Sequence, residues 1–365
     1  MKYFLIAGER SGDLHGSNLI RGIRAHDPSA EVSAWGGDLM EDAGARLLHH
    51  YRDSAFMGFV EVARNLRTIR RQMGECKQDI LSFRPDVLIL IDYAGFNLRM
   101  AEFAKQHGIP TYYYISPKVW AWNQKRAWKI KRVVDRMFCI FPFEVDFFRK
   151  FGYETDYVGN PLMDAIAAFR PDPAFRNNLD GRPVIALLPG SRVSEVKKML
   201  PKMLAAARDF RDYQVVVARV SNLPDELYAA IPPEVTSVTD ASYDLLSVAH
   251  AALVTSGTAT LETALFRVPQ VVCFSMNGLT YQIAKRLVKV PFISLVNLIA
   301  GREVVRELIQ QEFSVENLTR ELRKILSGEG RQRMLDDYAE VQEKVGGPGA
   351  SERAGELMVG YLTKS

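Results

Sequence analysis

Cysteine is scarce in this sequence, since only Cys76, Cys139 and Cys273 occur among its 365 residues. The three are odd in number, widely spaced and set in apolar or helical contexts without the spacing of metal ligands. This pattern argues against a disulfide framework and against a cysteine-based metal site. We expect reduced structural thiols in a cytoplasmic protein.

Long apolar runs are also absent. The first apolar run, from Phe4 to Ala7, is too short for the core of a signal peptide and ends at Gly8-Glu9. No run approaches the roughly 18 residues that a membrane-spanning helix needs. We therefore expect the first run to be a β-strand and any membrane contact to be peripheral.

Charge of one sign is not in large excess. The formal net charge is +4, with 25% charged and 47% hydrophobic residues. That charge is too mild for general nucleic-acid binding, so no nucleic-acid partner is expected, although clustered cations would suit an anionic ligand. The composition is that of a globular protein, and at roughly 150 residues per domain its length predicts two domains.

Short apolar runs alternate with helical segments, which predicts an α/β fold of two doubly wound, Rossmann-like domains. The expected strands are 3–7, 87–92, 112–115, 137–141, 157–159, 184–188, 214–219, 235–239, 251–254 and 270–274. Proline, asparagine and glycine accumulate before residue 183, which places the domains at 1–165 and 184–330 with a linker at 166–183. A glycine loop is expected over 297–303, before another helix, and C-terminal helices are expected over 331–365. The glycine-rich break at 346–349 would let the last helix cross onto the first domain or onto another copy of the chain, so a homodimer stays open.

Two stretches of the first domain carry polar residues after expected strands. Glu9, Ser11, Gly12 and Asp13 follow the first strand in a glycine turn whose spacing is not the dinucleotide G-x-G-x-x-G. Asp92 ends an apolar run typical of a central parallel strand, where an acid can serve as a general base. The alternatives are that the glycines only shape the turn, and that Asp92 caps a helix starting near Phe96.

A basic aromatic cluster lies between Lys118 and Arg136, with seven Lys or Arg residues, one acid and three interleaved tryptophans. No nucleic-acid-binding module accompanies it, so a phosphorylated ligand is favoured over nucleic acid. The alternative is a solvated helix with its tryptophans in the core. The ligand-binding candidates are Lys118, Trp120, Asn123, Lys125 and Arg126.

An amphipathic segment, 57–73, places arginines opposite an apolar face. Such a helix beside an apolar loop can rest on an anionic membrane surface. A surface helix with a solvated basic face is the alternative. The membrane-contact candidates are Phe56, Met57, Phe59, Arg64, Arg67 and Arg71.

The second domain has two glycine turns after expected strands. Gly190, Ser191 and Arg192 follow the strand at 184–188, and the arginine fork suits a pyrophosphate oxygen. The stretch from Val254 to Glu262 runs from a strand through a hydroxyl-rich turn into a helix. There Ser256 is expected to cap the helix, Gly257 and Thr258 to admit a phosphate, and Glu262 to accept a ribose diol. An ordinary capped helix is the alternative to this cradle, and a surface ion pair is the alternative for Arg192.

Seven segments in unchanged order together resemble the lipid-A-disaccharide synthase family of GT-B glycosyltransferases. They are GERSGDLHG, MGFVEV, PDVLILIDYAGFN, SPKVWAWNQKR, LLPGSR, SGTATLE and NLIAGRE. The resemblance implies inverting transfer of a diacylated glucosamine from UDP to a diacylglucosamine 1-phosphate, giving a β-1,6-linked disaccharide phosphate and UDP. It also implies attachment to the inner face of the inner membrane, where these amphiphilic substrates reside.

Roles for individual residues follow from the resemblance. Asp92 matches the expected base, with Glu9 as the second candidate. The pyrophosphate of the donor is expected at Arg192, Ser256, Gly257 and Thr258, while Asn297 and Arg302 join the donor-binding set, Asn297 at the uridine or leaving-group side. Ser11, Gly12 and Asp13 join the basic aromatic cluster as candidates for binding the acceptor. No Asp-x-Asp motif occurs, so we expect neither a metal nor a cofactor. Commoner family members have a small residue where Arg10 stands and an acid where Gly95 stands, so neither Arg10 nor an acid at position 95 is assigned a role.

Two other function classes compete with a transferase. A UDP-sugar epimerase on the same fold would use the same cradle, and a non-catalytic lipid- or nucleotide-binding protein would bind without turnover. Neither explains the whole ordered set of segments.

Overall fold

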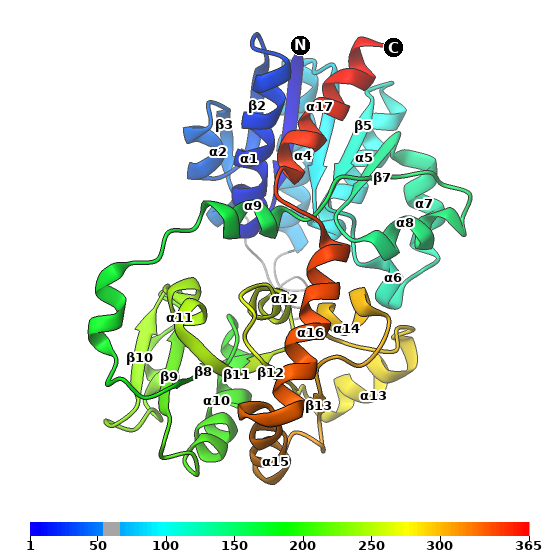
Figure 1. Cartoon of the computed structure of the whole chain (residues 1–365). Helices are drawn as coiled ribbons and strands as arrows, with labels where there is room; N and C mark the ends of the chain where they lie inside the picture. The colour runs from blue at the N-terminus through cyan, green and yellow to red at the C-terminus, as the bar shows by residue number, and fades with distance from the viewer. Residues whose placement is uncertain (54–65, 365) are drawn as a thin grey trace. The chain divides into compact units, whose positions relative to one another are not determined.

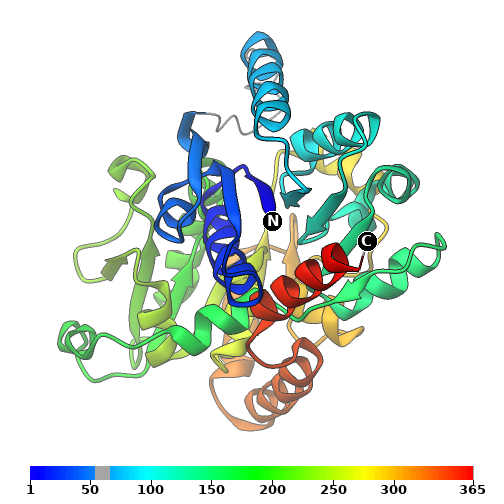
Figure 2. The same cartoon turned by 90° about the horizontal axis from the view of Figure 1, so that it is seen from above.

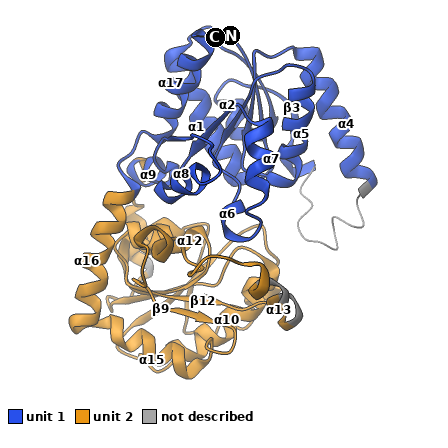
Figure 3. Ribbon diagram, turned by 90° about the vertical axis from the view of Figure 1, so that its right-hand side faces the viewer, with its two compact units in different colours: residues 1–167, 345–365 blue, residues 168–344 orange. Residues whose placement is uncertain are grey.

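The computed structural model describes residues 1–53 and 66–364, so the predicted membrane contacts Phe56, Met57, Phe59 and Arg64 lie outside the described residues. The chain forms two compact units (Figure 3). Unit 1 comprises Met1–Ala167 together with the C-terminal residues from Val345, and unit 2 comprises Ala168–Lys344.

Unit 1 contains a seven-stranded parallel sheet in the order β3-β2-β1-β4-β5-β6-β7. Apart from Lys2, its two central strands are buried at every position, as in other doubly wound sheets, whose faces are both covered by helices. The strands are β1 (Lys2–Ala7), β2 (Glu31–Gly36), β3 (Arg46–His50), β4 (Val87–Ile91), β5 (Thr111–Tyr114), β6 (Arg136–Cys139) and β7 (Asp156–Tyr157).

The helices of unit 1 include the last helix of the chain, α17, which packs along the first, α1 (Figures 1 and 2). Asp164 holds the start of α17 by accepting hydrogen bonds from the backbone amides of Gly349, Ala350 and Ser351. The helices are α1 (Arg10–His26), α2 (Asp38–Asp42), α4 (Leu66–Phe83), α5 (Ala94–Gln106), α6 (Val119–Trp122), α7 (Arg126–Val133), α8 (Pro142–Arg149), α9 (Pro161–Ala168) and α17 (Ala350–Thr363).

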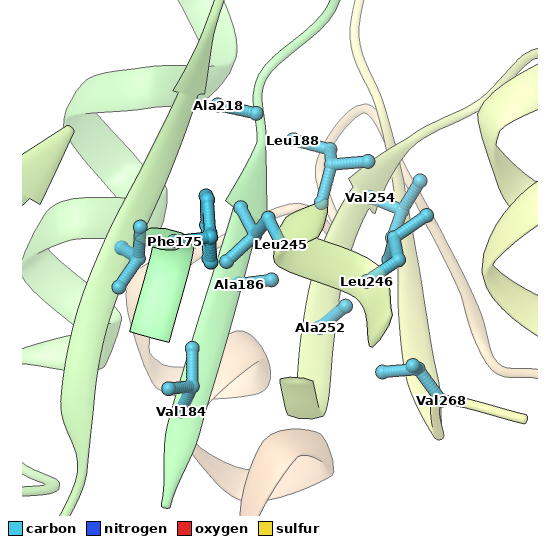
Figure 4. Close-up of a cluster of buried hydrophobic side chains, with 11 residues drawn as sticks. Phe175, Val184, Ala186, Leu188, Ala218, Leu245, Leu246, Ala252, Val254 and Val268 are labelled. Carbon is cyan, nitrogen blue, oxygen red and sulfur yellow. The ribbon is translucent and has the colours of Figure 1, made fainter. Parts of the chain in front are cut away.

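Unit 2 contains a six-stranded parallel sheet in the order β10-β9-β8-β11-β12-β13. On one face, Leu245 and Leu246 pack against apolar side chains of β8, β9 and β11 (Figure 4). The strands are β8 (Val184–Leu188), β9 (Gln214–Arg219), β10 (Thr236–Thr239), β11 (Ala249–Thr255), β12 (Gln270–Phe274) and β13 (Glu307–Ile309).

Helices form most of the crossover connections between the parallel strands of unit 2, whereas β9 and β10 are joined through a 3-10 turn at Asp225–Tyr228, and the last two helices follow β13. They are α10 (Val193–Ala207), α11 (Ser242–Val248), α12 (Thr258–Leu265), α13 (Gly278–Leu287), α14 (Leu295–Ala300), α15 (Val315–Leu326) and α16 (Gly328–Val345). Within the described part of the chain, no helix is long and apolar enough to cross a membrane.

The prediction of two parallel, doubly wound sheets is confirmed. One local prediction is wrong, because the glycine loop expected from Asn297 is helix α14, and Gly301 ends it in the left-handed conformation with φ 76°. The residues that follow lead into strand β13 and not into a helix.

Candidate functional site

The sheet of unit 1 has a topological switch point between β1 and β4. These strands are neighbours, with Ala7 paired to Ile91, and the chain order runs outward from them in both directions. In such sheets ligands bind outside the carboxyl ends of the strands at the switch point. Asp92 follows β4 directly and Glu9 follows β1 after Gly8, so both residues lie at the carboxyl edge of the sheet at this switch point.

Asp92 begins a strained turn. Asp92 and Tyr93 have φ values of 44° and 46°, a left-handed conformation that non-glycine residues seldom adopt. The amide of Asn97 holds this turn by donating to the carbonyl oxygens of Ile91 (3.1 Å) and Asp92 (2.9 Å). The Tyr113 hydroxyl also donates to the Asp92 carbonyl. Strain of this kind persists only where neighbours enforce it, and it clusters at functional sites.

Stacked rings support the same turn. Tyr93 stacks on Phe96, Phe96 on Trp35 and Trp35 on His49, with ring centroids 5.5, 5.9 and 4.1 Å apart. The indole nitrogen of Trp35 donates to Asp79 of α4 at 2.9 Å. These rings line a small cavity beside β1 and β2. Sequence reasoning assigned this aromatic stack no role, because its members come from separate segments.

The charges around Asp92 act in opposite directions. Burial raises the pKa of the Asp92 carboxyl, Lys118 lowers it and Glu9 raises it. Glu9 in turn accepts a hydrogen bond from the Ser11 hydroxyl at 2.7 Å. Asp92 is thus a carboxyl group with a raised pKa at a switch point, which is the environment of a general base. The alternative that Asp92 caps the next helix is wrong, since Tyr93 occupies the N-cap position of α5.

Two residues of unit 1 that were predicted to bind the acceptor substrate are buried and hydrogen-bonded within the unit. Asp13 is 2% exposed, and its carboxylate accepts from the amides of Gly37, Leu39 and Met40, which secures the start of α2. Trp120 is 5% exposed and donates to Glu144 at 3.1 Å. Direct contact of either side chain with an acceptor is therefore not supported by the structure.

The other acceptor candidates lie at the surface or close to it. Lys118, Lys125 and Ser11 are exposed, while Asn123 and Arg126 are half-buried and Gly12 is buried in the first turn of α1. The Arg126 guanidinium lies over the Trp122 ring, 5.2 Å from its centroid. In α4, Arg67 and Arg71 are exposed, as predicted, and Ile69 and Met73 of the predicted apolar face are partly buried. The helix is fully buried further along, at Cys76 and Ile80.

Unit 2 repeats the switch-point arrangement between β8 and β11, which pair Leu188 with Val254. The turns that follow these strands therefore emerge side by side at one sheet edge. In the first turn, Gly190 has φ 111°, and Glu195 accepts from the Ser191 amide (3.0 Å) and the Arg192 guanidinium (2.9 Å). Arg192 thus forms the local ion pair considered as its alternative role, with 63% of its side chain exposed.

The second turn is more open. Gly257 and Thr258 are exposed, and a β-carbon added to Gly257 would meet no atom within 4 Å. The prediction that Ser256 caps the helix is wrong, because Gly257 is the N-cap residue of α12 and the Ser256 hydroxyl donates to the Ile293 carbonyl at 3.1 Å. With no side-chain cap, the first turn of α12 presents amide groups and the positive end of the helix dipole.

Glu262 lies one turn beyond Thr258 on the same side of α12. Its Oε1 atom accepts from the Tyr243 hydroxyl at 2.9 Å. Burial raises the pKa of Glu262, and this hydrogen bond lowers it. Tyr243 was not predicted, and it fixes the orientation of the carboxylate.

Two residues of unit 2 that were predicted to bind the UDP-sugar donor are bonded to other residues of the same unit. Asn297 is fully buried, accepting from the amides of Val304 and Val305 and donating to the Val305 carbonyl and to Glu307. Its hydrogen-bonding capacity is thereby filled, so the prediction of direct contact with uridine is wrong. Arg302 pairs with Asp337 and Glu340 of α16.

In the part of the chain that the structure describes, no group of three or more His, Cys, Asp or Glu residues is arranged so that it could hold a metal ion.

Solved structures that resemble this chain share its fold. The UDP-GlcNAc 2-epimerase of Neisseria meningitidis, solved with UDP-GlcNAc, superposes with a TM-score of 0.70 at 14% identity and covers 100% of both chains. The glycotransferase of kitacinnamycin superposes with a TM-score of 0.67 at 15% identity, covering 99% of each chain. At such identities the likeness shows the fold alone, and that fold is the GT-B architecture.

The sequence comparisons are specific. The family model described as lipid-A-disaccharide synthetase matches residues 3–358. The lipid-A-disaccharide synthase of Trichlorobacter lovleyi is 39% identical over 376 residues, covering 100% of this chain and 98% of the relative. That of Coxiella burnetii is 36% identical over 336 residues, covering 88% of each. The chain therefore belongs to the lipid-A-disaccharide synthase family and is a glycosyltransferase, which confirms the resemblance.

Proposed function

We propose that the protein condenses UDP-2,3-diacylglucosamine with 2,3-diacylglucosamine 1-phosphate to give the β-1,6-linked disaccharide 1-phosphate and UDP. Membership of the family supports this substrate pair. The observation that carries the chemistry is the position of Asp92, which lies on a strained turn at the switch point of unit 1.

Asp92 acts in this proposal as the general base on the acceptor hydroxyl. Deprotonation of that hydroxyl lets it attack the anomeric carbon as the bond to UDP breaks, with inversion. A carboxylate whose pKa is raised by burial takes up a proton more readily than an ordinary aspartate. Glu9 is the second candidate, because it follows the neighbouring strand and its charge acts on Asp92.

The donor is assigned to unit 2. The uncapped start of α12 at Gly257 and Thr258 would hold the pyrophosphate, since helix N-termini bind anions. The free oxygen of Glu262 would accept the ribose diol, while Tyr243 holds the other oxygen. Arg192 would leave its ion pair with Glu195 and bind a phosphate of UDP. There it would stabilise the negative charge that develops on UDP as it departs. Positive charge and helix dipoles then replace a divalent ion, so the proposed reaction is metal-independent.

The acceptor is assigned to unit 1. Lys118, Lys125 and Arg126 are its candidate phosphate ligands, as cations that follow β5. The exposed arginines of α4, with the apolar residues before them in sequence, would attach the protein to the inner face of a membrane that holds both substrates. The proposal does not need a homodimer, because α17 packs on α1 of its own chain.

The experiment that tests the proposal incubates the purified protein with the UDP-linked donor, with and without acceptor, and analyses the products by mass spectrometry. The expected result is a disaccharide phosphate and UDP only when both substrates are present. An epimerised sugar nucleotide formed without acceptor would contradict the proposal, as would tight binding of both substrates without turnover. Turnover that survives EDTA is also expected, and loss of activity that a divalent ion restores would refute metal independence.

A further inference from the structure

Glu144 is a buried carboxyl group with no role in the reaction described so far. It is 1% exposed and lies in the first turn of α8. Its Oε1 accepts from the Ser116 hydroxyl (2.7 Å) and the Trp120 indole (3.1 Å). Its Oε2 accepts from the amides of Ile140 and Phe141, both at 3.1 Å. All four bonds donate toward Glu144, which is the pattern expected for an ionised carboxylate.

The environment of Glu144 makes that ion costly. Burial raises the pKa of Glu144 to about 7, against the opposing effect of the donated hydrogen bonds. The titratable groups that sense its charge are Cys139 and Tyr157, neither of which is a cation. One oxygen of the carboxylate completes the capping box of α8 by accepting from the backbone amide of the N-cap residue Phe141. The other oxygen has a separate use, because it binds two side chains on either side of Lys118.

The hydrogen bonds of Glu144 fix both ends of the segment Ser116–Trp120, called here the Ser116–Trp120 loop, whose last two residues begin α6. Ser116 and Trp120 lie on either side of Lys118, two residues before it and two after it. The loop starts where β5 ends, next to Asp92, since the Asp92 amide donates to the Tyr114 carbonyl at 3.2 Å. Between its two buried ends the loop presents Lys118 to solvent, and the charge of Lys118 reaches the Asp92 carboxyl.

We propose that Glu144 is a positioning residue, which holds Ser116 and Trp120 and thereby fixes Lys118 on the loop that starts next to Asp92. This inference rests on the proposed role of Asp92 as the base. It assigns Glu144 no contact with substrate. Its action is indirect, through the Ser116–Trp120 loop and the cation that this loop carries.

The pH profile follows from the groups that face Asp92. Lys118 lowers the pKa of Asp92 and the Tyr93 amide does so too, whereas burial and Glu9 raise it. Tyr113 packs against Asp92 from β5 and stays neutral, because burial raises its pKa. A base must be ionised to act, so kcat/KM falls as pH drops through the pKa of Asp92 in the free enzyme. Moving Lys118 away should raise that pKa and shift the acidic limb to higher pH.

The test measures kcat/KM for disaccharide formation across the acidic limb in the wild type, Glu144→Gln, Lys118→Met and the double variant. We expect each single variant to move the limb upward by roughly 0.5 to 1 pH unit. The double variant should move it no further, because both changes remove the same cation. Trp120→Phe removes one donated hydrogen bond and should give a smaller shift in the same direction. The control is Glu102→Gln, which loses only ion pairs to α7 and should leave the limb in place.

Three results would overturn the inference. The first is a Glu144→Gln variant that loses activity while the acidic limb of its kcat/KM profile stays in place. The second is an acidic limb that moves to lower pH in that variant. The third is a double variant whose shift equals the sum of the two single shifts. If Glu144→Gln does not fold, Trp120→Phe decides, and an unmoved limb in that variant is then the contrary result. Asp92→Asn separates this inference from the proposed function. Full activity in that variant refutes the base itself, whereas an inactive Asp92→Asn with an unmoved Glu144→Gln limb refutes only the positioning role.

Discussion

Gly257 is a residue whose glycine identity the fold does not explain. Its φ of 162° is extended, and a β-carbon there would point into open space. Glycine is tolerated at the N-cap of α12, and it also lets a phosphate approach the backbone closely, which is the reason tested here. We expect Gly257→Ala to leave the melting temperature unchanged and to weaken UDP binding about tenfold, or about 1.4 kcal/mol. Calorimetric titration of UDP together with a thermal melt measures both effects.

Gly190 is the matched control for Gly257. It also follows a strand of unit 2, but its φ is 111° and an added β-carbon would lie 2.6 Å from the Glu195 Cβ. Gly190→Ala should therefore lower the melting temperature. A Gly257→Ala variant that melts like Gly190→Ala, or one that binds UDP normally, would contradict the phosphate role.

The sequence could not predict which polar side chains are buried and hydrogen-bonded within the fold and which stay available to a ligand. Asp13, Trp120 and Asn297 belong to the family segments, yet all three are buried and bonded to atoms of their own unit. Asp92 and Glu262 were placed from the same kind of pattern. Whether such a side chain is free to bind a ligand depends on its hydrogen-bond partners, for example Glu307 for Asn297 and Tyr243 for Glu262. These partners lie outside the recognised segments and carry no sequence signal of their own.

At the scale of elements, helices α1 and α17 cross at glycines. A β-carbon added to Gly355 would lie 2.4 Å from the backbone of Gly22, whereas one added to Gly360 in the same helix would meet no atom within 4 Å. We expect Gly355→Ala to destabilise the protein by about 1–3 kcal/mol through overpacking. Gly360→Ala should be neutral or stabilising because alanine favours helix. Urea denaturation compares the two, and equal stabilities would refute this account of the crossing.

The elements that the sequence predicted best are strands marked by short apolar runs. The strands at Val184–Leu188 and Gln214–Arg219 match to the residue, because continuous apolar runs mark buried parallel strands. Strand β3 was missed, since Arg46 and two histidines break the apolar run and its side chains are only partly buried. Strand β13 has three residues, too few for any periodic signal.

At the scale of the whole molecule, membrane attachment is proposed to use the exposed arginines of α4. Reversing the charge at Arg67 and Arg71 should weaken binding to vesicles that contain anionic lipid, by about 1 kcal/mol per arginine, with the loss largest at low salt. Vesicle flotation measures it. The control reverses Arg149 and Lys150, exposed cations at the end of α8 in the same unit. Equal binding by both double variants would exclude α4 as the contact.

The central claim is a division of labour, with the base in unit 1 and the UDP site in unit 2. The most direct measurement of it is a pair of assays on Asp92→Asn, turnover with both substrates and calorimetric titration of UDP. The account predicts that disaccharide formation falls at least about 100-fold, as for loss of a general base, while the affinity for UDP stays at the wild-type value. Wild-type turnover in Asp92→Asn, or loss of UDP binding together with turnover, would contradict it.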